Sequence, residues 1–161
     1  MTLPTRSIEA LKSTISFSVQ KLGFITVQGT IADFSGTIAF SKEDLTNSFF
    51  DVCVRASTLS TGNPKRDEHL KSPDFFAIQN HPKVCFKSSS VKEQQGEYIA
   101  IGALTILGNT HNVEIPLKFN GSAFEGAFSL NRKDYGLGKK FPAFFIGNSV
   151  SLQITCTLKN V

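Results

Sequence analysis

The 161-residue chain has no Trp, one Met, two Tyr and only three Cys. No apolar run approaches the ~18 residues of a membrane-spanning helix, which excludes such helices. The cysteines (Cys53, Cys85 and Cys156) are odd in number and widely spread, so we expect buried thiols or a reducing compartment rather than a disulfide framework. Residues 1–12 lack the apolar core of a signal peptide. We therefore expect a cytoplasmic location, or a periplasmic one if the given chain lacks its leader.

Charge is also low, with 17 Lys and Arg against 13 Asp and Glu and a net charge of +4. This excess is too small and too scattered to predict a nucleic-acid partner. The apolar share of 40% is that of a folded globular chain, and the length suits one domain. We expect a single barrel domain over 1–161, in which residues 1–12 are loosely ordered or pair with an edge.

Phenylalanine is what the chain has in excess. There are 15 Phe, about twice the share usual for a soluble domain. So many large apolar rings need a dry environment. Either the core is unusually aromatic or the rings line a cavity.

Short stretches of alternating apolar and polar residues predict β-strands. Turn residues such as Leu22-Gly23, Gln95-Gly96, Gly108-Asn109 and Asn120-Gly121 separate them, and Gly36 is expected to break one. Pro116 lacks an N–H, which predicts a free or bulged edge. Eight or nine such strands close as an antiparallel barrel or sandwich, and an eight-stranded barrel has room for one small ligand. The stretches are 15–19, 24–34, 37–41, 50–56, 84–88, 97–107, 113–119, 124–130 and 150–158.

One segment departs from this pattern. Asn63 is a good N-cap, Pro64 suits the first helical position, and Pro73 ends the helix. A second short turn follows at 72–76, and a further turn is expected to start at 41–44. A helical excursion of this length between strands is usually functional, and a lid over one barrel end is its natural use.

The stretch 66–76, Arg-Asp-Glu-His-Leu-Lys-Ser-Pro-Asp-Phe-Phe, resembles the RDxHLxSxDFF signature of YceI-like proteins. Thr61-Gly62, 29–38, 82–88, 102–110 and 132–138 are similar to further family motifs, in the right order. The resemblance implies an all-β fold, namely an eight-stranded antiparallel lipocalin-like barrel with a short helical lid segment (about 63–76) and an apolar tunnel that holds a polyisoprenoid chain. The resemblance also implies that many members carry a secretion signal and act in the periplasm. Lys21 stands where many members have His, so head-group chemistry is expected to differ.

From this resemblance and the alternation we predict non-covalent binding of a long apolar lipid, a polyisoprenoid or isoprenoid quinone, for carriage, storage or sensing. A core filled by Phe is the alternative for any one ring, and a bulge would invert part of the set. The predicted lining is Phe17, Val19, Phe34, Phe40, Phe50, Val52, Leu70, Phe75, Phe76, Phe86, Leu104, Ile106, Phe119, Phe128 and Ile154.

Arg66, Asp67 and His69 are predicted to hold a head group or the lid. Asp67 either caps a turn and pairs locally, or acts with His69 as an acid–base pair in an enzyme on a lipid-linked substrate. No nucleophile motif accompanies them, so we predict a protein that is not an enzyme. No His or Cys pair has metal-ligand spacing, so neither a metal nor another cofactor is predicted.

Arg132, Lys133, Lys139 and Lys140 surround a Gly-Leu-Gly turn that lacks the rest of a dinucleotide motif. Such a run is most simply a solvated loop. Alternatively it lies at the barrel mouth and attracts an anionic head group or membrane surface. A homodimer and a solid-core stress-related interaction protein also remain open.

Overall fold

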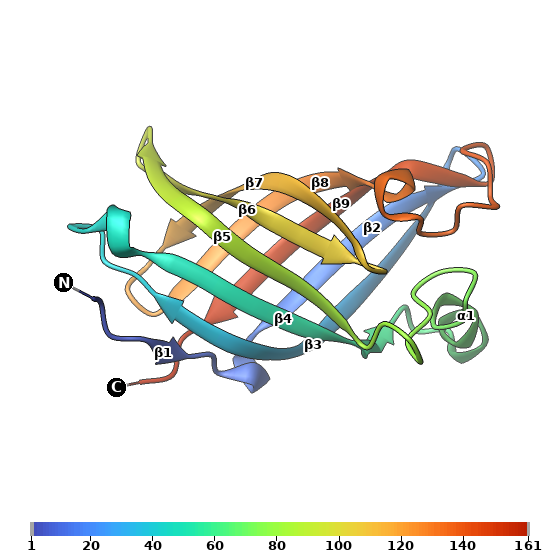
Figure 1. The fold of residues 1–161 in the computed structure, drawn as a ribbon. Helices are drawn as coiled ribbons and strands as arrows, with labels where there is room; N and C mark the ends of the chain where they lie inside the picture. Colours follow the sequence, from blue (N-terminus) through green and yellow to red (C-terminus); the bar gives the residue numbers. More distant parts are fainter. Residues whose placement is uncertain (1, 161) are drawn as a thin grey trace.

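The computed structural model describes residues 2–160, and they form a closed antiparallel barrel (Figure 1). Neighbouring strands follow the order β3-β2-β9-β8-β7-β6-β5-β4, and β3 pairs again with β4. The predicted eight-stranded barrel is therefore confirmed. The strands are β1 Arg6–Ser7, β2 Thr14–Lys21, β3 Ile25–Ala39, β4 Phe49–Ser60, β5 Lys83–Gln94, β6 Glu97–Ile106, β7 Asn109–Phe119, β8 Ala123–Asn131 and β9 Ile146–Thr157.

The helices are α1 Pro64–Leu70 and three short 3-10 turns, η1 Ala10–Lys12, η2 Leu45–Asn47 and η3 Arg132–Tyr135. The capping residues predicted for the helical excursion are confirmed. The Asn63 side chain accepts a hydrogen bond from the Arg66 N–H (3.1 Å), and Pro64 is the first helical residue. None of the helices in residues 2–160 is long and apolar enough to cross a bilayer.

Gly36 does not end a strand, contrary to expectation. β3 runs through it because this residue has φ 112°, a conformation that suits glycine, and because a Cβ here would collide with the backbone of Asp51 on β4. Glycine therefore allows a close approach of two strands instead of a break between them.

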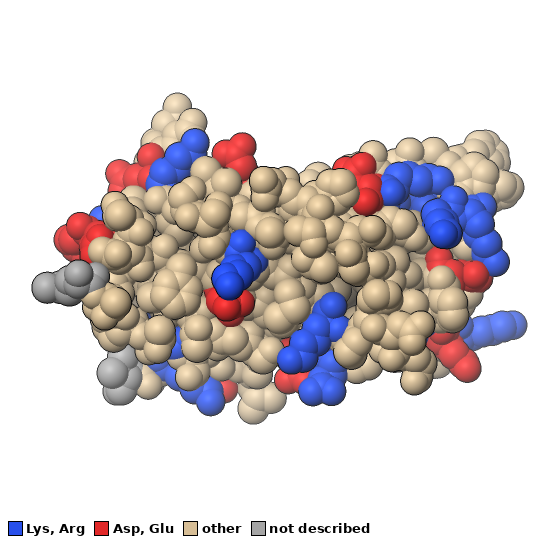
Figure 2. Space-filling view, in the orientation of Figure 1, with Lys and Arg blue, Asp and Glu red and all other residues tan. Residues whose placement is uncertain are grey.

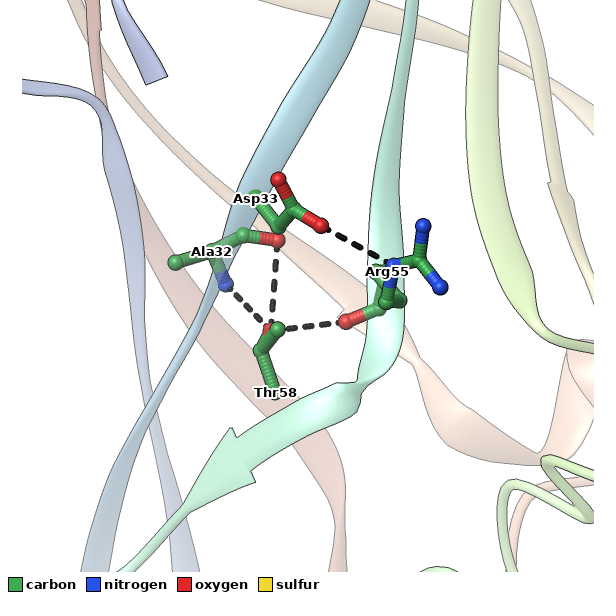
Figure 3. A network of polar contacts seen from close by, with 4 residues as sticks. All are labelled: Ala32, Asp33, Arg55 and Thr58. Atoms are coloured by element: carbon green, nitrogen blue, oxygen red, sulfur yellow. Dashed lines mark hydrogen bonds and ion pairs between the residues drawn. The ribbon is translucent and has the colours of Figure 1, made fainter. Parts of the chain in front are cut away.

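The barrel closes between β3 and β4, where the register shifts. Figure 3 shows the polar network at this point. The Ala32 N–H donates to Thr58 Oγ1 (2.8 Å), which lies 2.7 Å from the Arg55 carbonyl oxygen. Arg55 Nε lies 2.9 Å from Asp33 Oδ2. The Thr58 hydroxyl thus replaces ladder hydrogen bonds that the bulge removes.

The seam between β7 and β8 is short. Their pairing begins at Leu117, immediately after Pro116, which confirms the free edge predicted there. η3 lies against the open part of β7. Asn109 Nδ2 donates to the Tyr135 carbonyl oxygen (2.9 Å), and His111 Nε2 lies 2.9 Å from that of Asp134. Side chains therefore close the wall where the ladder stops.

The N-terminal segment pairs with the edge of β3 and contributes the buried side chain of Ile8 to the core. Arg6 and Ser7 face Ile38 and Thr37 of β3, and Ile8 bridges to Leu158. Figure 1 shows both chain termini at the end of the barrel opposite α1.

The two barrel ends differ in their connections. We call one end the mouth. It carries the β2–β3 hairpin tip, the lid segment (residues 61–82, with α1) and the β8–β9 segment (residues 132–145). The opposite end, where β1, η1 and η2 lie, we call the closed end. In Figure 1 the mouth is at the right.

Candidate functional site

An apolar cavity of about 500 Å³ occupies the barrel interior. Every one of the eight barrel strands contributes apolar side chains to its wall. On β9, for example, Val150, Leu152 and Ile154 face the cavity, while Ser151 and Gln153 between them are exposed. The alternation of a half-buried strand therefore builds the wall, and the interior is not solid.

Thirteen of the fifteen side chains predicted to line a cavity do line this one. They belong to the strand stripes and to the lid segment. They are Phe17, Val19, Phe34, Phe50, Val52, Leu70, Phe75, Phe76, Phe86, Leu104, Ile106, Phe128 and Ile154.

The structure places the other two, Phe40 and Phe119, below the cavity at the closed end. Phe40 meets Tyr98, Phe119 and Phe124 edge to face, with ring centroids 4.9–5.0 Å apart. Phe119 and Phe124 stack at 4.4 Å. Because Phe124 also lines the cavity, this cluster is its floor. Phe40 and Phe119 thus seal the end rather than line the wall.

At the mouth, the lid segment and the β8–β9 segment meet. The rings of Phe75 and Phe141 stack at 5.3 Å and 13°, and the His69 ring stands edge-on to both. All three side chains line the cavity. Phe141 was not predicted, because it lies in a loop where no periodicity marks which side chains point inward.

An ion pair ties the same two segments together. Lys140 Nζ lies 2.9 Å from Asp74 Oδ1, and His69 Nε2 lies 2.8 Å from Asp74 Oδ2. Hydrogen bonds from Lys140, and then from His69, lower the pKa of Asp74 below its ordinary value. Asp74 is therefore ionised at neutral pH, and it joins the lid to the opposite segment.

Asp67 does not line the cavity, so of the two roles predicted for it, head group or lid, its contacts fit local pairing in the lid. It is buried, and its Oδ1 accepts hydrogen bonds from the Thr61 N–H (2.9 Å) and the Thr61 hydroxyl. Its carboxylate is thus used to fix the start of the lid segment, and His69 pairs with Asp74 instead. The structure does not bring Asp67 and His69 together as an acid–base pair.

Arg66 does line the cavity. Its Nε donates to Thr61 Oγ1 (2.9 Å) and its Nη2 to the Thr61 carbonyl oxygen (3.1 Å). Of the three residues predicted to hold a head group or the lid, Arg66 and His69 therefore line the cavity, both at the mouth.

The solvated-loop interpretation is wrong for Arg132, which is only 2% exposed. Its guanidinium donates to five carbonyl oxygens, those of Gly147, Leu137, Gly138, Phe141 and Ile146, at 2.7–3.0 Å. Burial lowers its pKa. Arg132 holds the β8–β9 segment in its fold, whereas Lys133, Lys139 and Lys140 are exposed.

The expectation against a disulfide is also wrong, because Cys53 and Cys85 are joined. They are 32 residues apart in sequence, but the β4–β5 register sets them directly opposite each other, with Cα atoms 4.1 Å apart. Such closely spaced antiparallel pairs suit a cross-strand bond. The disulfide thus closes the loop that contains the whole lid segment.

Cys156 is a free thiol, buried near the closed end. Burial raises its pKa to about 12, against a smaller opposing effect of a hydrogen bond with Ser13. Within residues 2–160, no group of three His, Cys, Asp or Glu side chains is arranged to hold a metal ion.

This chain is similar in sequence to known proteins. The family described as YceI-like domain matches residues 7–158. A UPF0312 protein of Photorhabdus laumondii is 29% identical over 131 residues, covering 75% of this chain and 68% of that protein. Protein YceI of Salmonella arizonae is 29% identical over 133 residues, covering 76% and 70%.

Two solved structures share the fold. Burkholderia cenocepacia BcnA superposes with a TM-score of 0.86 at 18% identity, covering 95% of this chain and 99% of that one. A polyisoprenoid binding domain from Saccharophagus degradans superposes with a TM-score of 0.73 at 10% identity, covering 99% and 100%. The motifs at 66–76 and elsewhere, the barrel and the match over 7–158 agree: this chain belongs to the YceI-like domain family.

Proposed function

We propose that the protein binds a long apolar lipid non-covalently in its barrel and acts as a carrier, store or sensor without chemistry of its own. The ligand class we propose is a polyisoprenoid or an isoprenoid quinone. The observation that carries the proposal is the cavity of about 500 Å³, whose walls are almost entirely apolar. The shared fold with a domain that is described as polyisoprenoid binding supports it.

A long apolar chain should bind more tightly than a short one. Each methylene group moved from water into an apolar site contributes about 0.8 kcal/mol. Association costs at least about 4 kcal/mol in lost freedom. A ligand must therefore bury many such groups before binding is favourable, and a rigid aromatic wall keeps the ordering cost of the protein low.

The polar end of the ligand is proposed to lie at the mouth. Arg66 and His69 are the predicted head-group residues that face the cavity, and both are there. The deep interior offers only van der Waals contacts, so a polar group placed there would lose its hydrogen bonds to water. The chain therefore enters first and the head group stays near Arg66 and His69.

We propose no catalytic step, because the two residues that the sequence suggested as an acid–base pair, Asp67 and His69, are engaged in other contacts. The Asp67 carboxylate accepts from Thr61, and His69 pairs with Asp74. The hydrogen bonds of Arg66 to Thr61 and of His69 to Asp74 hold these two side chains at the mouth, where we propose that the polar end of the ligand lies.

The test is lipid extraction from the purified protein with identification by mass spectrometry, together with titration of the C20 alcohol geranylgeraniol. Leu152→Trp should narrow the cavity and lower the bound lipid about tenfold or more, since several methylene contacts are lost. Gln153→Trp is the matched control, because this neighbouring side chain is exposed on the outer face of β9. It should bind as the unmodified chain does.

Circular dichroism and thermal melting establish that both variants fold. Equal lipid content in Leu152→Trp and Gln153→Trp would contradict binding inside the barrel. Turnover of an added ester or pyrophosphate lipid, abolished by His69→Ala, would replace the proposal with an enzyme.

A further inference from the structure

Exposed apolar side chains gather at one end of the molecule. Within residues 2–160 there are six large apolar side chains with high exposure, and five of them lie at the mouth. Phe24 is 79% exposed and Phe144 is 72% exposed. We call the five the apolar rim: Leu22, Phe24, Ile25, Phe144 and Phe145.

The rim is one surface although it comes from two loops. The Leu22 N–H in the β2–β3 hairpin donates to the Phe145 carbonyl oxygen in the β8–β9 segment (3.1 Å). The Phe144 and Phe145 rings meet edge to face at 5.4 Å. Leu22 and Phe145 also line the cavity. The rim is therefore continuous with the cavity wall.

Positive charge is concentrated around the same opening. Residues 22–24, 61–82, 107–108 and 132–145 connect the strands at the mouth, and they contain seven Lys and Arg against four Asp and Glu. The rest of the chain contains ten Lys and Arg against nine Asp and Glu. Of the net charge of +4, three positive charges therefore belong to the connections at the mouth. Figure 2 shows Lys and Arg at the end that carries η3 and α1, beside an uncharged protrusion at the tip of β2 and β3.

Exposed Phe side chains flanked by Lys form a surface suited to an anionic lipid bilayer. The rings can enter the boundary between head groups and acyl chains, and the lysines then meet anionic phosphates. The periphery of an ordinary protein–protein interface is polar. The five side chains of the apolar rim are all hydrocarbon, so a bilayer suits this surface better than a protein partner does.

We infer that the apolar rim docks the mouth onto an anionic membrane surface, so that a lipid passes between bilayer and cavity without crossing water. This inference rests on the proposed function, because the bilayer is the source or destination of the ligand. The continuity of Leu22 and Phe145 with the cavity wall supplies the route.

Flotation with vesicles tests it. Vesicles of phosphatidylcholine with one-third phosphatidylglycerol are compared with vesicles of phosphatidylcholine alone, at low and high salt. The unmodified chain should float with the anionic vesicles, and salt should weaken this binding. Phe24→Ser combined with Phe144→Ser should lower vesicle binding about tenfold or more.

Leu11→Ser is the matched control, because Leu11 is 97% exposed but lies in η1 at the closed end. It should float as the unmodified chain does. Lys133→Glu combined with Lys139→Glu should lower binding to the anionic vesicles at low salt by about tenfold. The binding that remains at high salt should be unchanged. Lys12→Glu with Lys42→Glu is the control pair away from the mouth.

None of Phe24, Phe144, Lys133 and Lys139 lines the cavity. These variants should therefore still take up geranylgeraniol delivered from detergent, which separates a failure of docking from a failure of lipid binding. Equal flotation of the rim variant and the unmodified chain would overturn the inference. So would a dimer in sedimentation experiments that the rim variant dissociates, because the rim would then be an interface between two copies.

Discussion

At the closed end of the barrel, Phe40, Phe119 and Phe124 meet ring against ring and exclude both water and ligand. At the mouth, Phe75 and Phe141 also stack, but each is carried by a connecting segment rather than by a strand. The same residue type thus fills the barrel interior at one end and joins two connecting segments over the other.

The difference lies in what holds the rings. At the closed end, Phe119 and Phe124 belong to a paired β7–β8 ladder, so moving one ring requires breaking strand pairing. At the mouth, the two segments are joined by the Phe75–Phe141 stack, by the edge-on contact of His69 with Phe141, and by the partly exposed Asp74–Lys140 pair. Segments with few buried contacts open at low cost in free energy, which is the property required of a lid.

Removing one ring from each end should have the largest effect. Phe124→Ala, at a side chain 1% exposed, should lower the free energy of unfolding by about 3–5 kcal/mol. Phe141→Ala should cost less than half of that, because the ring is only partly buried. Urea denaturation measures both. Equal losses would mean that the two ends are packed alike.

The disulfide offers the second test, because it anchors the base of the lid. Replacing both Cys53 and Cys85 by Ser should lower the free energy of unfolding by about 3 kcal/mol, since the unfolded chain regains the entropy of a long loop. A reductant should destabilise the unmodified chain to a similar degree and leave the double variant unchanged.

Thiol counting is the accompanying control. In denaturant without reductant, one free thiol of three is expected, that of Cys156. Three free thiols before reduction would show that the bond is not formed.

These residues also show how much of the structure can be predicted from the sequence. Alternation predicts which face of a strand a side chain occupies, and this was enough to identify the inward stripes of β2, β4 and β9. It does not say how far along the barrel axis a residue lies. Phe40 and Phe119 have the inward face expected of them, yet they belong to the floor cluster at the closed end and do not line the cavity wall.

Contacts made by loops and by register were beyond the sequence for a different reason. Phe141 and Arg132 face inward because η3 and the carbonyl groups around Arg132 fold the β8–β9 segment back, and no local period records this. The pairing of Cys53 with Cys85 depends on the β4–β5 register across a 32-residue separation. Only once strands are aligned do such residues become neighbours.

A third test uses Cys156 to measure how dry the closed end is. The folded-state pKa of about 12 lies above the ordinary value of 9.0, so the folded protein keeps this thiol protonated. Its contribution to stability is complete below pH 9, and it is lost as pH rises toward 12, because the unfolded chain ionises first. Between pH 8 and pH 10, ionisation of this thiol in the unfolded chain should lower the free energy of unfolding by about 1.4 kcal/mol.

Cys156→Ala removes this contribution and leaves the other titrating groups in place. The stability difference between the variant and the unmodified chain should therefore change with pH by that amount in urea denaturation. A difference that stays constant from pH 8 to pH 10 would indicate that water reaches the thiol and that the closed end is not sealed.

The smallest expected change in stability is at the lid. Lys140→Ala removes the ion pair with Asp74, and an exposed pair of this kind adds little to global stability. The urea midpoint should scarcely move. Release of bound geranylgeraniol should nevertheless be faster, and backbone hydrogen exchange over residues 63–82 should increase, because the lid segment loses its tie to the β8–β9 segment.

The Asp74 carboxyl reports the same contact directly. Its lowered pKa means that the pair is complete above about pH 3.8 and is lost only as the pH falls further, through the folded-state value. In a carboxyl-carbon NMR titration, Lys140→Ala should raise the Asp74 midpoint toward its ordinary value. Lys133→Ala is the matched control, because this exposed lysine lies on the same segment but has no contact with Asp74 in residues 2–160. If lipid release and the Asp74 titration are unchanged in Lys140→Ala, the lid is held by the Phe75–Phe141 stack alone, and the ion pair has no part in the difference between the two ends.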